Sequence, residues 1–209
     1  MSTKIVFQGD SITDCGRGTC GGAGFSNWGA GLGYPGMIGA RLWAKYPERD
    51  YKIINTGISG NRIVDLYARW KIDTLNLEPD ILSILIGVND SLHELGSRNG
   101  VEVPRYERIY RELLRWTLDA RPGIKIILIE PFLGPNNQAV ASLEQDVAQR
   151  RQVVRKLADE FQTVFLPTQS MFEEAAKRAP WSYWSADAVH PTPAGHQMIT
   201  DAWLEAMGL

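Results

Sequence analysis

The chain has 209 residues and a formal net charge of −2, and it contains no run of four consecutive Lys or Arg residues. This balance argues against the basic surface by which proteins bind nucleic acid or an acidic membrane, and it suits a small neutral or weakly polar substrate. Because single domains usually have about 100–200 residues, and no repeat or linker divides the chain, we expect residues 1–209 to form one domain.

Short β-rich segments alternate with longer segments of helical periodicity. In chain order we expect a strand at Lys4–Gln8, a helix at Gly36–Lys45, a strand at Tyr51–Asn55, a helix at Arg62–Asn76, a strand at Ile81–Ile86, a helix at Pro104–Ala120, a strand at Ile124–Glu130, a helix at Ala141–Phe161, a strand at Val164–Leu166, and helices at Gln169–Arg178 and Pro193–Met207. Several strands are almost continuously apolar, as parallel strands covered on both faces must be. This alternation predicts an α/β fold with a doubly wound parallel sheet between two helix layers.

The N-terminus carries no recognisable targeting signal, because Met1–Lys4 leads directly into the first strand without a long apolar segment. No apolar run approaches the roughly 20 residues that a membrane-spanning helix needs. We therefore expect a cytoplasmic protein without a membrane partner. Cys15 and Cys20 then favour two reduced thiols, with a redox or disulfide role as the alternative.

Small polar residues follow three of the predicted strands, where an open parallel sheet binds its ligands. They form the segments Gly9-Asp10-Ser11-Ile12-Thr13-Asp14, Thr56-Gly57-Ile58-Ser59-Gly60-Asn61 and Gly87-Val88-Asn89-Asp90, and a fourth segment, Asp187-Ala188-Val189-His190-Pro191, precedes the last helix. Each segment alone is compatible with an ordinary turn or helix cap. Their common position at one edge of the sheet points to a functional site.

Four blocks in these regions resemble, in order, the motifs of the GDSL/SGNH hydrolase superfamily, and they span nearly the whole chain. They are Phe7-Gln8-Gly9-Asp10-Ser11-Ile12-Thr13, Gly57-Ile58-Ser59-Gly60-Asn61, Gly87-Val88-Asn89-Asp90 and Asp187-Ala188-Val189-His190-Pro191. The resemblance implies a three-layer α/β/α fold with a flavodoxin-like parallel five-stranded sheet. It also implies a serine esterase without a metal or organic cofactor. The one small departure in the first motif is Ile12, which replaces a leucine.

The resemblance implies a catalytic triad of Ser11, His190 and Asp187. A serine hydroxyl needs a base to take its proton, and imidazole can accept that proton and return it to the leaving group. Asp187 can fix the tautomer of His190 and stabilise the imidazolium. His93 and His196 are competitors for the role of base, but His93 follows a motif whose amide is already assigned, and His196 falls inside the predicted last helix without a nearby preceding aspartate.

The resemblance also implies an oxyanion hole formed by the backbone N–H groups of Ser11 and Gly60 and the side-chain amide of Asn89. Gly60 lacks a Cβ that would obstruct the substrate, and the Asn89 amide carries two donors. We expect Asp10 and Asp90 to hold their loops in place without transferring protons, and Asp14 to cap the helix that follows Ser11.

A narrower resemblance, to intracellular acetylxylan esterases and related carbohydrate esterases, depends on the residues around the first two motifs. They are Gly9-Asp10-Ser11-Ile12-Thr13-Asp14-Cys15-Gly16-Arg17, Gly31-Leu32-Gly33-Tyr34, Asn55-Thr56-Gly57-Ile58-Ser59-Gly60-Asn61 and Ala68-Arg69-Trp70. Those enzymes carry a tryptophan directly before the catalytic aspartate, whereas this chain has Ala186. Trp181 and Trp184 stand slightly upstream and can stack on sugar rings or pack between subunits.

The resulting expectation is an acetylesterase that acts on small-molecule or oligosaccharide esters. The alternatives are a lysophospholipase or thioesterase acting on lipid esters, and a non-catalytic carbohydrate-binding protein that has kept the fold. The glycine-rich loop from Gly16 to Gly33 is long enough to be functional, either as a wall of the pocket or as an oligomer contact. The sequence leaves open whether the chain forms a homo-oligomer.

Overall fold

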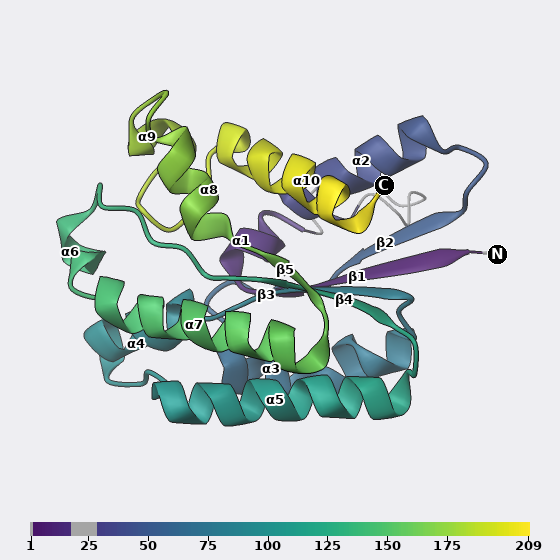
Figure 1. Ribbon diagram of the computed structural model, residues 1–209, viewed down its shortest axis with the longest axis horizontal. Coiled ribbons are helices and arrows are strands. Elements are labelled where there is room, and N and C mark those ends of the chain that lie inside the picture. Colours follow the sequence, from purple (N-terminus) through teal and green to yellow (C-terminus); the bar gives the residue numbers. More distant parts are fainter. Residues whose placement is uncertain (1, 18–28) are drawn as a thin grey trace.

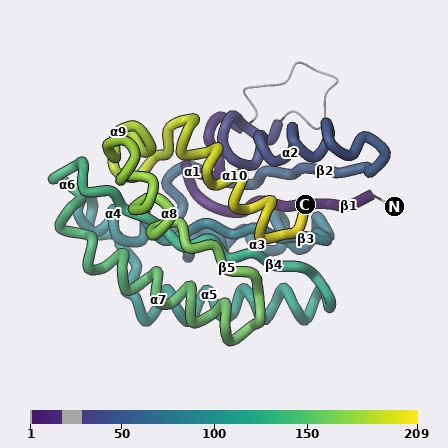
Figure 2. Tube along the Cα trace, turned by 45° about the horizontal axis from the view of Figure 1, so that its top comes forward, coloured from purple at the N-terminus to yellow at the C-terminus, as the bar shows by residue number. Residues whose placement is uncertain are grey.

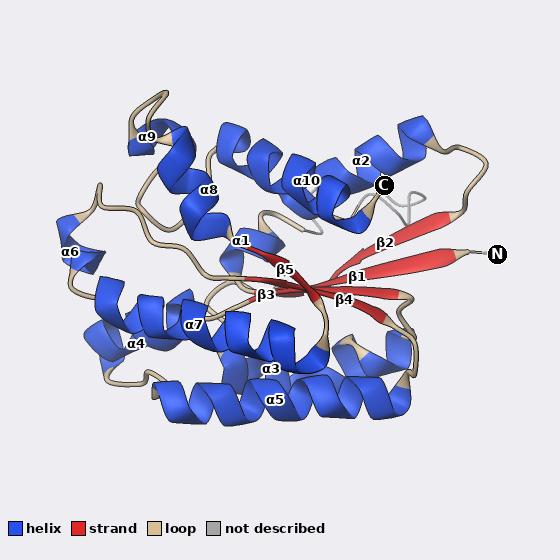
Figure 3. Ribbon diagram, in the orientation of Figure 1, coloured by secondary structure: helices blue, strands red, loops and turns tan. Residues whose placement is uncertain are grey.

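A computed structural model describes residues 2–17 and 29–209 of the chain. Five parallel strands form its central sheet, in the order β2-β1-β3-β4-β5. They are β1 (Thr3–Gly9), β2 (Tyr51–Asn55), β3 (Ile81–Leu85), β4 (Lys125–Ile129) and β5 (Val164–Leu166). Figure 3 shows this sheet between two layers of helices, and the three-layer α/β/α architecture expected from the sequence is confirmed.

The two faces of the sheet carry different helices (Figure 1). One face is covered by α2 (Tyr34–Lys45), α8 (Thr168–Ala175) and α10 (Pro193–Met207), and the other by α3 (Ile63–Asp73), α5 (Val103–Ala120) and α7 (Glu144–Phe161). Figure 2 shows α10 beside α2. Within β1, Phe7 packs against Trp203 of α10, while Val6 belongs to the cluster on the opposite face, as the alternation of side chains along a strand requires.

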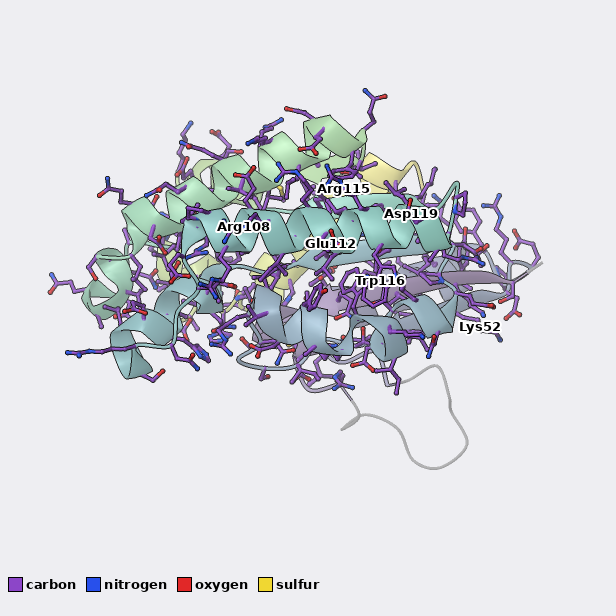
Figure 4. All side chains as sticks on the ribbon, turned by 90° about the horizontal axis from the view of Figure 1, so that it is seen from below. Lys52, Arg108, Glu112, Arg115, Trp116 and Asp119 are labelled. Carbon is purple, nitrogen blue, oxygen red and sulfur yellow. The ribbon has the colours of Figure 1, made fainter. Side chains whose placement is uncertain are left out.

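The helix α5 shows how the sequence pattern produces these layers. Leu113 and Leu114 are fully buried against the sheet. Figure 4 shows Arg108, Glu112, Arg115 and Asp119 along the outward face of the same helix, all exposed to solvent. Their spacing of three or four residues follows the helical period, so the charged face and the buried face lie on opposite sides.

Short helices lie beyond the carboxyl ends of the strands (Figure 1). They are α1 (Ser11–Asp14), α4 (Val88–Ser97), α6 (Gln138–Ala141) and α9 (Trp181–Trp184). The chain order of the strands reverses between β1 and β3, where Gly9 pairs with Leu85. In open α/β sheets this reversal creates a crevice that binds ligands, so residues that follow β1, β2 and β3 are well placed to form a site.

Some predicted boundaries differ from the structure. The helices α4 and α9 were not predicted from the sequence. The predicted helix Ala141–Phe161 is interrupted at Ser142 and Leu143, between α6 and α7. The predicted helix Arg62–Asn76 ends at Asp73 and is followed by a short 3₁₀ turn, η1 (Leu75–Leu77). The central part of the Gly16–Gly33 loop, with Cys20, lies outside the described residues. Among the helices that the structure describes, none combines the length and apolarity that crossing a membrane requires.

Candidate active site

Ser11 is the first residue of α1 and lies immediately beyond the end of β1. Asp10 forms the N-cap of α1, and its Oδ1 accepts a hydrogen bond of 3.0 Å from the backbone N–H of Ile12. Gly9 is required before this turn, because a Cβ on it would lie 2.4 Å from the carbonyl oxygen of Leu85 and 2.3 Å from Thr13 Oγ1. The tight packing of β1 against β3 therefore fixes where the serine emerges.

Ser11, His190 and Asp187 form a continuous hydrogen-bonded chain. Ser11 Oγ lies 2.8 Å from His190 Nε2, although the two residues are 179 positions apart in the sequence. His190 Nδ1 lies 2.7 Å from Asp187 Oδ2. Asp187 Oδ1 accepts further hydrogen bonds from the backbone N–H groups of Val189, at 3.1 Å, and of His190, at 2.7 Å.

The ionised carboxylate of Asp187 determines which nitrogen of the His190 ring carries a proton. Partial burial raises the pKa of Asp187, but the hydrogen bonds from the His190 backbone, the His190 ring and the Val189 backbone outweigh it, and the pKa falls below its ordinary value. The ionised carboxylate can only accept, so His190 Nδ1 carries the proton. His190 Nε2 is then free to accept the proton of the Ser11 hydroxyl.

The loop that carries Asp187 and His190 is held in place by hydrogen bonds to its backbone carbonyl oxygens from the segment before α6. Ala188 is buried in a left-handed conformation, with φ of 76°, and its carbonyl oxygen accepts a hydrogen bond of 2.7 Å from Gly134 N–H. Asn137 Nδ2 donates to the carbonyl oxygen of Asp187 at 3.3 Å. Asn136 Nδ2 likewise donates to Ser185 O at 3.1 Å. These supports were not predicted from the sequence, where their only signal is the adjacent pair Asn136 and Asn137 before α6.

The three donors expected for an oxyanion hole follow β1, β2 and β3. Asn89 lies in the first turn of α4, and its Nδ2 donates one hydrogen bond of 3.1 Å to the carbonyl oxygen of Asn61, which leaves the second amide hydrogen available. Gly60 has a φ of 82°, and among the described residues the atom nearest to a Cβ built on it would be His93 Nε2, at 4.0 Å. Within the described residues, the N–H groups of Ser11 and Gly60 donate no hydrogen bond.

The two buried acidic neighbours contact the backbone. Both oxygens of Asp90 accept from the N–H of Ile63, at 3.1 and 3.2 Å. Burial raises the pKa of Asp10 and of Asp90 to about 7. Asp10 holds the turn before α1, and Asp90 joins the start of α3 to α4, as expected for residues that hold their loops in place.

The prediction that Asp14 caps the helix after Ser11 is wrong. This helix begins at Ser11 itself, so the capping position falls on Asp10, and Asp14 is the last residue of the helix. Asp14 Oδ2 instead accepts from the backbone N–H of Ser59 at 3.0 Å and from Ser59 Oγ at 2.7 Å. Asp14 therefore connects α1 to the loop that carries Gly60.

The other two histidines lie outside this hydrogen-bonded chain. His196 is buried in α10, where its Nδ1 accepts from the backbone N–H of Tyr34 at 3.2 Å and its Nε2 lies 3.5 Å from Cys15 Sγ. Burial also raises the pKa of the Cys15 thiol, which does not favour a reactive thiolate. His93 lies in α4, near Gly60.

The stability of the fold should depend on His196 below neutral pH. Burial, and after it the charge of His190, lowers the pKa of His196 to about 4. Between this value and about 6.5, the unfolded chain binds a proton that the folded chain does not, so stability is lost as the pH falls. The side-chain oxygen of an asparagine at this position can still accept the hydrogen bond from the Tyr34 N–H, but it does not titrate. When the pH falls from 7.5 to 5, we therefore expect the free energy of unfolding of His196→Asn to decrease by about 2 kcal/mol less than that of the wild type.

Denaturant unfolding of both proteins at the two pH values measures this difference. The raised pKa values of Asp10 and Asp90 act in the opposite direction, because they make the folded state bind more protons as the pH falls. They are present in both proteins and cancel in the comparison. The same pH dependence in the two proteins would contradict a neutral, buried His196.

The two tryptophans upstream of Asp187 have different surroundings. Trp184 is buried in the core and its Nε1 donates to the carbonyl oxygen of Ala179 at 3.2 Å. Trp181 stacks on Phe172, with the ring centroids 6.0 Å apart, and lines a hollow of about 430 Å³ together with Gly134. Ala186 is exposed beside Asp187.

The acidic side chains and histidines of the site are engaged with the backbone or with one another. In residues 2–17 and 29–209, no group of three or more His, Cys, Asp and Glu side chains is arranged to hold a metal ion.

Comparison with known proteins places the chain among esterases. The GDSL-like lipase/acylhydrolase family matches residues 7–198. The acetylxylan esterase of Geobacillus stearothermophilus is 37% identical over 98% of this chain and 94% of its own length. The crystal structure of an acetylxylan esterase from the same organism covers 99% of this chain and 94% of its own, with a TM-score of 0.87 and 36% identity.

Two further solved structures agree with this placement. A protein from Parabacteroides merdae, named provisionally as a GDSL-like lipase, is 41% identical, covers 99% of this chain and 95% of its own, and has a TM-score of 0.89. An α/β hydrolase enzyme from the metagenome of Lake Arreo, Spain, is 31% identical with the same coverage and a TM-score of 0.87. The chain belongs to the GDSL-like lipase/acylhydrolase family and is a serine esterase, a carboxylic ester hydrolase.

Proposed function

We propose that Ser11, His190 and Asp187 form the catalytic triad of this esterase. The observation that carries the proposal is the hydrogen-bonded chain of 2.8 Å from Ser11 Oγ to His190 Nε2 and 2.7 Å from His190 Nδ1 to Asp187 Oδ2. This order places the base on the nucleophile and the carboxylate on the base. It is further supported by solved catalytic mutants of the Geobacillus acetylxylan esterase, in which one serine and one aspartate are replaced by alanine.

The reaction begins when His190 Nε2 takes the proton of Ser11 as Oγ attacks the ester carbonyl. The oxyanion that develops accepts hydrogen bonds from Ser11 N–H, Gly60 N–H and the free amide hydrogen of Asn89. His190 then returns the proton to the leaving alkoxide, and an acyl group remains on Ser11. Water, activated by His190 in the same way, attacks this acyl-enzyme and restores the free serine.

The substrate that we propose is an acetyl ester of a carbohydrate. The relative with 37% identity is named an acetylxylan esterase, and a solved variant of that esterase is called an acetyl-xylooligosaccharide esterase. The residues around Ser11 and Gly60 carry the same resemblance. A lipid ester, as cleaved by a lysophospholipase or thioesterase, is the alternative, because the small Ala186 beside Asp187 leaves more room than a tryptophan would.

Acyl-chain length separates the two substrate classes. We expect kcat/KM to fall steeply from acetyl through butyryl to octanoyl in a series of p-nitrophenyl esters, because a pocket closed beyond the acetyl methyl rejects longer chains. An open acyl channel would instead gain up to about 0.8 kcal/mol for each methylene that it buries. A rise of kcat/KM towards octanoyl would therefore contradict the proposed acetyl ester and favour a lipid ester as the substrate. Failure to hydrolyse any ester would favour a carbohydrate-binding protein.

A further inference from the structure

Arg69 of α3 belongs to a motif whose role the proposed mechanism does not explain. Its side chain is 13% exposed, and the guanidinium group donates to four oxygens. They are Asn61 Oδ1 at 2.8 Å from Nε, the carbonyl oxygen of Thr56 at 2.7 Å from one terminal nitrogen, Asp73 Oδ2 at 3.1 Å from the same nitrogen, and the carbonyl oxygen of Gly9 at 3.4 Å from the other.

Three of these acceptors belong to segments that carry the proposed oxyanion donors. Gly9 ends β1 and lies two residues before Ser11. Thr56 and Asn61 enclose the loop after β2, which contains Gly60. Thus one planar group contacts the chain at the carboxyl ends of two neighbouring strands, β1 and β2, and the segment that follows each strand contains one proposed backbone donor.

The third donor, the side-chain amide of Asn89, is connected to the guanidinium group of Arg69 through Asn61. Arg69 Nε holds the side chain of Asn61, and the backbone carbonyl oxygen of Asn61 accepts the hydrogen bond of 3.1 Å from Asn89 Nδ2. This bond occupies one hydrogen of the Asn89 amide and so fixes where the other one points. The orientation of Asn89 therefore depends on the position of Asn61.

We propose that Arg69 is a positioning residue that holds the three oxyanion donors in one arrangement before the substrate binds. The inference rests on the proposed function, because Arg69 acts only through Ser11, Gly60 and Asn89. A guanidinium group suits this task because it is planar and presents five donors in fixed directions. An ammonium group in its place is a point charge that reaches only some of these acceptors.

The test compares Arg69→Ala with Asn89→Ala and with a matched control. Because a displacement of about 1 Å from the productive geometry can cost about 100-fold in rate, we expect Arg69→Ala to lower kcat between about 10-fold and 100-fold, with little change in KM. The control is Arg111→Ala, which removes a similarly covered arginine, 19% exposed, that pairs with Glu107 and Glu160 between α5 and α7. This control should lower thermal stability and leave kcat unchanged.

Two further measurements distinguish positioning from general support of the fold. Guanidinium ion at non-denaturing concentration should restore part of the lost kcat in Arg69→Ala and should leave the kcat of Asn89→Ala and of Arg111→Ala unchanged. Arg69→Lys, which remains testable if the alanine variant does not fold, should have a kcat between those of Arg69→Ala and the wild type. An Arg69→Lys protein with wild-type kcat, or an Arg69→Ala protein with the kcat of the control, would overturn the inference.

The Asn89→Ala variant separates this inference from the proposed function. If Asn89→Ala loses kcat while Arg69→Ala does not, the oxyanion hole stands and only the role of Arg69 is wrong. If Asn89→Ala keeps its kcat, the proposed donor set is wrong and the inference falls with it. A loss in KM alone in Arg69→Ala would assign the residue to substrate binding and would also overturn the inference.

Discussion

Replacing Ser11 with alanine is expected to lower kcat by about a million-fold, which is the loss that removing the nucleophile causes in a serine hydrolase. The remaining rate comes from the oxyanion donors and from substrate binding, which the substitution leaves in place. Ser11 is partly exposed at the start of a four-residue helix, and its Oγ is hydrogen-bonded to His190, so its removal leaves no cavity in the core. The melting temperature should therefore change little.

Hydrolysis of p-nitrophenyl acetate by Ser11→Ala and by wild type measures this effect. Ser170→Ala is a suitable control, because Ser170 is exposed in α8 and its hydroxyl donates to the carbonyl oxygen of Pro167, three residues earlier in the chain. The control should have wild-type kcat. Activity of Ser11→Ala within 100-fold of the wild type would mean that another group is the nucleophile.

Asp187→Asn is expected to lower kcat by about 10⁴-fold, because it changes the tautomer of His190 and leaves the geometry almost intact. The Asp187 carboxylate can only accept a hydrogen bond, so the proton lies on Nδ1 and Nε2 faces Ser11 Oγ without one. An asparagine amide can donate to Nδ1 and so move the proton to Nε2, where it blocks proton transfer from Ser11. The low pKa of Asp187 keeps the carboxylate ionised over the whole neutral range.

Steady-state kinetics of Asp187→Asn near neutral pH test this role. Asp201→Asn serves as the control, since Asp201 is exposed on α10 and bonded to Gln197. KM should change much less than kcat, because Asp187 stabilises a charge that develops on His190 only during the reaction. A fall of less than tenfold would contradict the assigned role and leave Asp187 as a structural residue of its loop.

Most of the fold was predictable because its signals are local. The apolar strands and the periodic helices, such as α5 with its charged outward face, are visible in the sequence as patterns. The helix α4 was missed because its first turn, Val88–Asp90, has the composition of a polar junction. The interruption between α6 and α7 was missed because Ser142 and Leu143 carry no glycine or proline signal.

The candidate site was predictable where a motif marks it and not where it depends on contacts between distant segments. The structure brings Ser11 and His190 to 2.8 Å, as the family resemblance implied. The capping role of Asp14 was wrong because the sequence does not show that the helix begins at Ser11. The contacts of Arg69 join Gly9, Thr56 and Asn61, and no sequence pattern predicts which of 22 basic residues reaches them.

Labelling with a serine-reactive phosphonate tests the assignment of Ser11 as the nucleophile most directly, because it identifies the residue that is modified. Trypsin cleavage after Lys4 and Arg17 releases residues 5–17 as one peptide that contains a single serine, Ser11, and a single cysteine, Cys15. After incubation of the wild type with a p-nitrophenyl phosphonate, mass spectrometry should find the adduct on Ser11 in this peptide, together with loss of activity. An adduct on any other residue, or inactivation without modification of Ser11, would contradict the assignment of Ser11 as the nucleophile.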